Sequence, residues 1–72
     1  MKLKINGENK TIDHSDEELF LEVLITNLGY HPQLVVVELN GVIINPKDWI
    51  NTKIKDGDCL EVVTIVGGGS YI

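Results

Sequence analysis

The chain has 72 residues, of which 43% are hydrophobic and 24% charged, as is ordinary for a single small globular domain. A domain of this size buries only about 60% of its unfolded surface, which leaves too little interior for an enclosed catalytic pocket beside a stable core. The net charge of −5 argues against nucleic acid, which requires a basic face, and is compatible with a partner that presents a basic surface.

Cysteine and histidine are scarce. The single cysteine, Cys59, excludes an internal disulfide and suits a reducing cytosol, so we expect a cytoplasmic protein. His14 and His31 are too far from it in the sequence to predict a metal site. The N-terminus lacks the apolar core of a signal peptide, and no apolar run approaches the roughly 20 residues that span a membrane.

The first twelve residues predict a β-hairpin. Residues 1–5 alternate between apolar and polar side chains, which is the period of a half-buried strand. Asn6-Gly7 follows, a pair typical of the type I′ turn because both central residues of that turn need positive φ. A second strand is expected near residues 8–12.

The next segment predicts a helix that begins at Ser15. Ser15 and Glu18 have the spacing of a capping box, and the carboxylates of residues 16–18 suit the positive end of the helix dipole. This explanation accounts for the acidic run without a catalytic or metal cluster. Gly29 stands where a C′ glycine would end the helix. One apolar stripe is formed by Leu21, Leu24, Ile25 and Leu28.

The second half begins with an aliphatic stretch, residues 34–39, that predicts a strand. Asn40-Gly41 predicts a second hairpin turn, and residues 42–44 its short return strand. Thereafter Asn45 has the character of an N-cap, with Pro46 at the first position of a helical turn.

Trp49 follows in this irregular stretch. We expect it to anchor the packing there; stacking on a ligand is the alternative. Asp56-Gly57-Asp58 predicts a turn, and residues 59–66 a final strand.

The order of these elements predicts an α+β domain over residues 1–66, followed by a flexible tail over residues 67–72. A hairpin, one main helix and further strands are typical of the β-grasp, or ubiquitin-like, fold: a mixed sheet of four to five strands with the helix on one face. In this fold the first and last strands lie side by side in the middle of the sheet.

The final strand has two distinct faces. Leu60, Val62, Thr64 and Val66 alternate with Glu61, Val63 and Ile65. Because the helix covers only one side of the sheet, we expect Val63 and Ile65 to point outward and to form a docking face for a partner. A shift of register by one residue would bury them instead. The neighbouring strand would add to this face either Val36 with Glu38 or Val35 with Val37.

Cys59, at the start of this strand, has no histidine near it in the sequence. We interpret it as a small buried hydrophobic residue rather than a nucleophile.

Three glycines follow this strand: Gly67, Gly68 and Gly69. Without Cβ atoms, such a segment passes through a narrow channel in extended form, and a terminal glycine carboxylate is unhindered at its α-carbon. An enzyme could activate that carboxylate as an acyl-adenylate, from which a sulfur nucleophile displaces AMP. On its composition alone, the segment is equally typical of a flexible linker or a cloning scar.

The sequence context favours the reactive interpretation. The stretch from Asn45-Pro46 through Trp49 and the Asp-Gly-Asp turn to the aliphatic strand and terminal glycines resembles the ThiS family, the sulfur carriers of thiamin biosynthesis. The resemblance spans the chain and is most specific from Trp49 to Gly69.

The resemblance implies a protein co-substrate that is not itself an enzyme and binds no cofactor. Gly69 would be adenylated by an enzyme related to ubiquitin-activating enzymes, which uses Mg-ATP, and Gly67 and Gly68 would be recognised with it. The resulting thiocarboxylate would take its sulfur from a desulfurase system and deliver it on thiazole synthase. The carrier alone would be a monomer.

The chain departs from the family pattern at Ser70-Tyr71-Ile72, which follow Gly69. We expect a peptidase to remove these residues, or the mature protein to lack them. Two alternatives remain open: a sulfur carrier for another product, such as molybdopterin, and a β-grasp interaction module with a passive tail.

Overall fold

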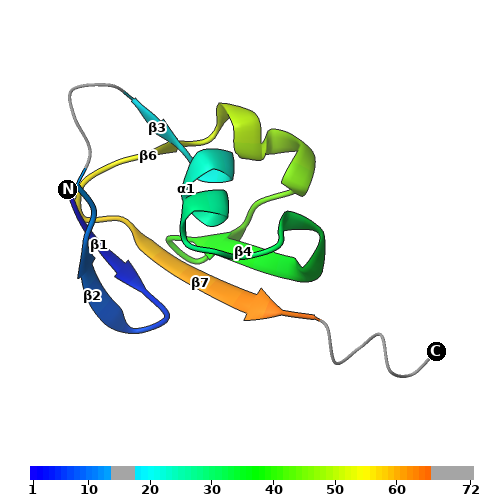
Figure 1. Ribbon diagram of the computed structural model, residues 1–72, viewed down its shortest axis with the longest axis horizontal. Helices are drawn as coiled ribbons and strands as arrows, with labels where there is room; N and C mark the ends of the chain where they lie inside the picture. Colours follow the sequence, from blue (N-terminus) through cyan, green and yellow to red (C-terminus); the bar gives the residue numbers. More distant parts are fainter. Residues whose placement is uncertain (14–17, 66–72) are drawn as a thin grey trace.

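The computed structural model describes residues 1–13 and 18–65. Its main sheet has five strands in the order β2-β1-β7-β4-β5. The strands are β1 (Lys2–Ile5), β2 (Glu8–Thr11), β4 (Val35–Leu39), β5 (Val42–Ile43) and β7 (Cys59–Thr64). β1 and β7 are parallel and central, whereas the other pairs are antiparallel. Helix α1 (Leu21–Asn27) covers one face of this sheet (Figure 1). The predicted β-grasp fold is therefore confirmed.

Both predicted hairpin turns are present. Asn6 and Gly7 have φ values of 52° and 82°, and Asn40 and Gly41 have values of 51° and 86°. Positive φ at both central residues is what a type I′ turn requires. These two turns return β2 beside β1 and β5 beside β4.

The predicted start of the helix is wrong. Glu18 precedes β3 (Leu19–Phe20), and α1 begins only at Leu21. β3 pairs with β6 (Lys53–Ile54), a strand that the sequence analysis did not predict, and the Leu21 N–H donates to the Thr52 carbonyl at 2.8 Å. This pairing holds the backbone extended where a capping box would have made it helical. Ser15, Asp16 and Glu17, the rest of the predicted cap, lie outside the described residues.

Glu18 has a different partner from the one predicted. Its carboxylate accepts a hydrogen bond from Lys53 Nζ at 2.8 Å, in an ion pair between two exposed side chains. Glu18 therefore bridges the β3 and β6 segments at the surface and takes no part in capping α1.

The helix ends as predicted. Gly29 has a φ of 90°; its N–H donates to the Thr26 carbonyl, and the Tyr30 N–H donates to the Ile25 carbonyl. This pair of bonds is a Schellman motif. The predicted apolar stripe faces the core, with Leu21, Leu24 and Ile25 buried and Leu28 half-buried.

The described residues also include two short 3₁₀ helices. The first, η1 (Pro32–Leu34), precedes β4, so that strand starts one residue later than predicted. The second, η2 (Pro46–Asn51), begins as predicted: the Asn45 side chain accepts a hydrogen bond from the Lys47 N–H at 3.1 Å. The predicted turn at Asp56-Gly57 is also present.

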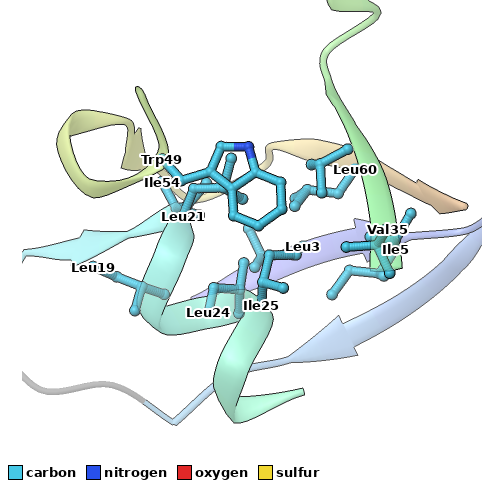
Figure 2. Packing of buried hydrophobic residues seen from close by; sticks show 12 residues of the cluster. Leu3, Ile5, Leu19, Leu21, Leu24, Ile25, Val35, Trp49, Ile54 and Leu60 are labelled. Atoms are coloured by element: carbon cyan, nitrogen blue, oxygen red, sulfur yellow. The ribbon is translucent and has the colours of Figure 1, made fainter. Parts of the chain in front are cut away.

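Within residues 1–13 and 18–65, the core is formed by twelve buried hydrophobic residues from the strands, α1 and η2. Trp49 is the largest of them, with 1% of its surface exposed, and its indole Nε1 donates to the Ile44 carbonyl at 3.0 Å. Figure 2 shows the indole ring among the side chains that α1 and the strands contribute. The predicted packing role of Trp49 is confirmed.

Candidate functional site: the outer face of the sheet

The face of the sheet opposite α1 carries exposed aliphatic side chains. On β4 and β7, Val36 lies opposite Val63, and Glu38 lies opposite Glu61 two residues further along the ladder. The exposed fractions are 36% for Val36, 65% for Ile43, 57% for Val63 and 47% for Ile65. We call these four residues the outer patch. An exposed apolar group of this kind is typical of a protein-binding surface.

The strand register explains why these side chains are exposed. Successive residues of a strand point to opposite faces, and Val35, Val37 and Val62 are buried against the helix side. Val63 therefore points outward, and Ile65 is likewise exposed, as the alternation in the sequence predicts. Of the two pairs considered for β4, Val36 and Glu38 belong to this face.

Ile43 joins the outer patch from β5, where it lies opposite Glu38. A shallow groove of about 350 Å³ opens beside it at this edge of the sheet. Its lining is mainly apolar and consists of Val35, Val36, Ile43, Ile44, Asn45, Pro46 and Trp49. The outer patch thus continues into a hollow on its β5 side.

The end of β7 is held firmly to its neighbours. The Ile65 N–H donates to the Leu34 carbonyl at 2.7 Å. Upstream, the Asn6 side chain bonds both backbone groups of Val62, accepting from its N–H at 2.7 Å and donating to its carbonyl at 3.2 Å. The backbone is therefore fixed up to Ile65.

The predicted reactive tail lies beyond this point. Gly67, Gly68 and Gly69, with Ser70, Tyr71 and Ile72, lie outside the described residues. In the sequence, Ile65 of the outer patch comes two residues before Gly67, the first residue of the segment to which the sequence analysis assigns the chemistry.

Two other residues considered from the sequence are also placed. The sequence analysis predicted that Cys59 would be buried, but this residue is only half-buried. It lies on the outer face, opposite Lys4 of β1. Trp49 is among the residues that line the groove, but with 1% of its surface exposed it leaves almost no ring surface on which a ligand could stack.

The described residues contain neither a candidate metal site nor a membrane-spanning helix. Within residues 1–13 and 18–65, no three His, Cys, Asp or Glu side chains are grouped so that they could hold a metal ion. In the same part of the chain, no helix is long and apolar enough to cross a membrane.

One feature of this face was missed from the sequence, namely that Glu38 and Glu61 lie directly opposite each other. The pairing of β4 with β7 joins residues that are far apart in the chain, and no turn sequence sets its register. In the structure the Asn40 side chain accepts a hydrogen bond from the Cys59 N–H at 2.9 Å and so fixes the two strands at one end, but no local pattern in the sequence indicates this contact.

The fold and this face together define a ubiquitin-like β-grasp protein with an exposed apolar sheet surface, whose last strand is followed in the sequence by three glycines. The ThiS family model matches residues 3–69. The chain therefore belongs to the ThiS family, as the sequence resemblance indicated.

Solved structures agree with this assignment. The crystal structure of the thiamine biosynthesis protein (ThiS) from Geobacter metallireducens is 36% identical, with a TM-score of 0.81, over 96% of this chain and 100% of that one. A solution structure of a thiamine biosynthesis protein from the same organism has a TM-score of 0.75 and 34% identity, over 88% of this chain and 81% of that one.

Curated relatives fall into two groups. A thiazole synthase from Paramagnetospirillum magneticum is 39% identical over 97% of this chain, which spans only 21% of that protein's length. An uncharacterized protein, ycf40, from Porphyra purpurea is 32% identical over 96% of this chain and 93% of its own length.

Proposed function

We propose that this chain is a sulfur carrier of thiamin biosynthesis and that Gly69 carries the sulfur. The observation that supports this most directly is the extent of the family match, which ends at Gly69 and leaves out Ser70, Tyr71 and Ile72. The carrier acts as a protein co-substrate, and its part in the chemistry is to present one unhindered carboxylate.

The chemistry begins at that carboxylate. In the sequence as given, the Gly69 carboxyl group is in a peptide bond with Ser70, so a peptidase must first hydrolyse that bond. The Gly69 carboxylate then attacks the α-phosphorus of ATP on a separate adenylating enzyme, which forms an acyl-adenylate and releases pyrophosphate. This mixed anhydride activates the carbonyl because AMP is a good leaving group.

Sulfur enters in the second step. The terminal sulfur of a persulfide, formed by a desulfurase system from cysteine, attacks the Gly69 carbonyl and displaces AMP. A thiol then cleaves the S–S bond, which leaves the thiocarboxylate on the carrier and a disulfide on the donor. Glycine suits this position because a side chain on the α-carbon would hinder both the attack and the passage of the tail through a channel.

Thiazole synthase is the proposed acceptor of the sulfur. Two thiazole synthases, from Paramagnetospirillum magneticum and Magnetococcus marinus, contain a segment similar to almost the whole of this chain. A carrier-like segment and a thiazole synthase in one polypeptide support the view that the two proteins act together.

Intact mass spectrometry tests the proposal. A chain that ends at Gly69 retains every core residue of the described ranges, since these lie between Leu3 and Val62. Incubated with Mg-ATP and the adenylating enzyme of the same genome, it should gain the mass of an adenylyl group. After addition of the desulfurase system it should show the mass of one oxygen replaced by sulfur.

Two controls make this test specific. The 72-residue chain should not react before cleavage, and Gly68→Arg in the chain ending at Gly69 should abolish adenylation while its circular dichroism spectrum stays unchanged. Failure of the unsubstituted chain ending at Gly69 to form an adenylate would contradict the proposal.

A further inference from the structure

Strand β2 forms one edge of the main sheet and, in the described part of the chain, pairs only with β1. All four of its residues are exposed. Where this ladder ends, the Ile12 N–H donates to the Met1 carbonyl at 2.8 Å, and the Met1 amino group donates to the Ile12 carbonyl at 3.2 Å. Met1 and Ile12 are thus a hydrogen-bonded pair of the antiparallel ladder, which sets the pattern for the rest of β2.

The backbone groups of β2 alternate in direction along the strand. Hydrogen-bonded pairs occur at every second residue of an antiparallel ladder, so Glu8 and Lys10 exchange their bonds with β1. The N–H and carbonyl groups of Asn9 and Thr11 therefore point away from the sheet. Free groups of this kind on an edge strand are a template for a further strand.

The side chains of β2 carry both signs of charge on one face of the sheet. Glu8 and Lys10 are two residues apart, so they project to the same face, where they form an exposed ion pair at 3.6 Å. A lysine on an edge strand commonly prevents pairing with another chain. With a glutamate beside it, that protection fails against a strand that presents the same two charges in reverse order.

An antiparallel copy of β2 is such a strand. When Asn9 lies opposite Asn9 of the second copy, their outward-facing backbone groups meet, and Glu8 lies opposite Lys10 on both sides of the two-fold axis. A slide by two residues in one direction brings two Glu8 side chains together, and in the other direction two Lys10 side chains. Opposite charges across a strand pair are stabilising and like charges are destabilising, so the charges select one register.

We propose that two copies of this chain associate through β2, antiparallel and with Asn9 at the two-fold axis, so that their sheets become one continuous sheet. Each Asn9 N–H donates to the Asn9 carbonyl of the other copy. The flanking Glu8 and Lys10 form two ion pairs between the copies, at non-hydrogen-bonded positions, where Cα atoms are only about 4.5 Å apart. This association goes beyond the proposed function and does not depend on it.

The association leaves the outer patch free. A two-fold axis through an antiparallel strand pair runs perpendicular to the sheet, so both outer faces lie on the same side. β1 separates β2 from β7, and the outer patch lies from β7 onward. The contact involves one four-residue strand from each copy, far less area than a stable dimer needs, so we expect a Kd on the order of 1 mM. The dilute chain is then monomeric, as the family resemblance implies.

Association at high concentration is the first measurement. The 72-residue chain is followed from about 0.05 to 2 mM by sedimentation velocity and by ¹⁵N NMR, a range that brackets the expected Kd. The fraction of dimer should rise across this range, and the concentration-dependent shifts should be largest at the Asn9 and Thr11 amides. A chain that stays monomeric throughout, or whose shifts lie on another surface, would contradict the proposal.

Charge reversal tests the register. Across the interface Glu8→Lys creates two pairs of lysines and Lys10→Glu two pairs of glutamates, so each variant alone should remain monomeric at about 2 mM. An equimolar mixture of the two should associate, because every such pair then joins opposite charges. Both variants keep a net negative charge, so overall charge does not draw them together. Glu8→Lys/Lys10→Glu in one chain should restore self-association.

Two further variants separate the ion pairs from overall charge and from the backbone bonds. Glu22→Lys makes the same charge change as Glu8→Lys at an exposed position on α1, and it should associate like the unsubstituted chain. Asn9→Pro removes an outward N–H and no bond to β1, so it should keep the circular dichroism spectrum and abolish association. Self-association of Glu8→Lys alone, or a mixture of the two reversed chains that stays monomeric, would overturn the proposed register.

Discussion

Asn6 performs three structural roles, one with its backbone and two with its side chain. Its backbone takes the positive φ of the hairpin turn, and its carboxamide bonds the N–H and the carbonyl of Val62. The same amide group lies 3.4 Å from the hydroxyl oxygen of Tyr30, which follows the end of α1. The carboxamide thus continues the pairing of β1 with β7 after the β1 backbone has turned away.

Asn6→Gly separates the turn from the pairing. Glycine accepts positive φ at no steric cost but leaves the two Val62 backbone groups without their partners. We expect a loss of about 1–2 kcal/mol in the free energy of unfolding, measured by urea denaturation, and faster hydrogen exchange at the Val62 amide. Asn9→Ala, at an exposed position on β2, should change neither quantity. Equal stability of Asn6→Gly and the unsubstituted chain would show that the carboxamide bonds contribute nothing.

At the level of whole elements, short sequence patterns correctly predicted those turns and helix ends that depend on residues with positive φ. Asn6-Gly7, Asn40-Gly41 and Gly29 each need positive φ, and each marks its turn or helix end correctly. The start of α1 was mispredicted because the pairing of β3 with β6 joins residues 19–20 to residues 53–54, which are distant in the chain. A capping-box pattern does not reveal a competing strand partner.

The same limit applies to the candidate site. The alternation along β7 predicted that Val63 and Ile65 would be exposed, because one face of the sheet had to receive the helix. The opposition of Glu38 and Glu61 depends on the register between two strands joined by no tight turn. A register of this kind is set by packing over the whole sheet, so local sequence patterns could not supply it.

The end of α1 offers a test with two alanines of opposite effect. Gly29→Ala places a Cβ at a φ of 90°, and since no atom lies within 4 Å of that Cβ, the cost is conformational rather than steric. We expect it to lower the free energy of unfolding by about 1–2 kcal/mol in thermal or urea denaturation. Asn27→Ala, at the exposed last residue of the helix, should raise it by about 0.3 kcal/mol because alanine has the higher helix propensity. A neutral Gly29→Ala would mean that the helix ends equally well without the left-handed residue.

For the molecule as a whole, the fold separates stability from recognition. The twelve buried hydrophobic residues of the described part of the chain form one core cluster, whereas the outer patch, Glu38 and Glu61 remain exposed or half-exposed to solvent on the outer face. β7 lies in the middle of the sheet (Figure 1) and takes part in both functions. Its residues Leu60 and Val62 belong to the core, whereas Val63 is exposed on the outer face. A surface kept for a partner should therefore leave the free protein less stable than it could be.

Thermal denaturation at low ionic strength tests this trade-off. Glu38→Gln/Glu61→Gln should raise Tm by about 2–5 °C, because like charges opposite each other in a sheet cost up to roughly 1 kcal/mol and 1 kcal/mol corresponds to about 4–8 °C in a domain of this size. Glu8→Gln/Glu22→Gln changes the net charge equally and should give no rise, since it also removes the exposed Glu8–Lys10 pair. About 0.5 M NaCl should shrink the difference between the two variants, because salt screens charges near the surface. An equal rise in Tm for both variants would attribute the effect to overall charge and not to the opposition of Glu38 and Glu61.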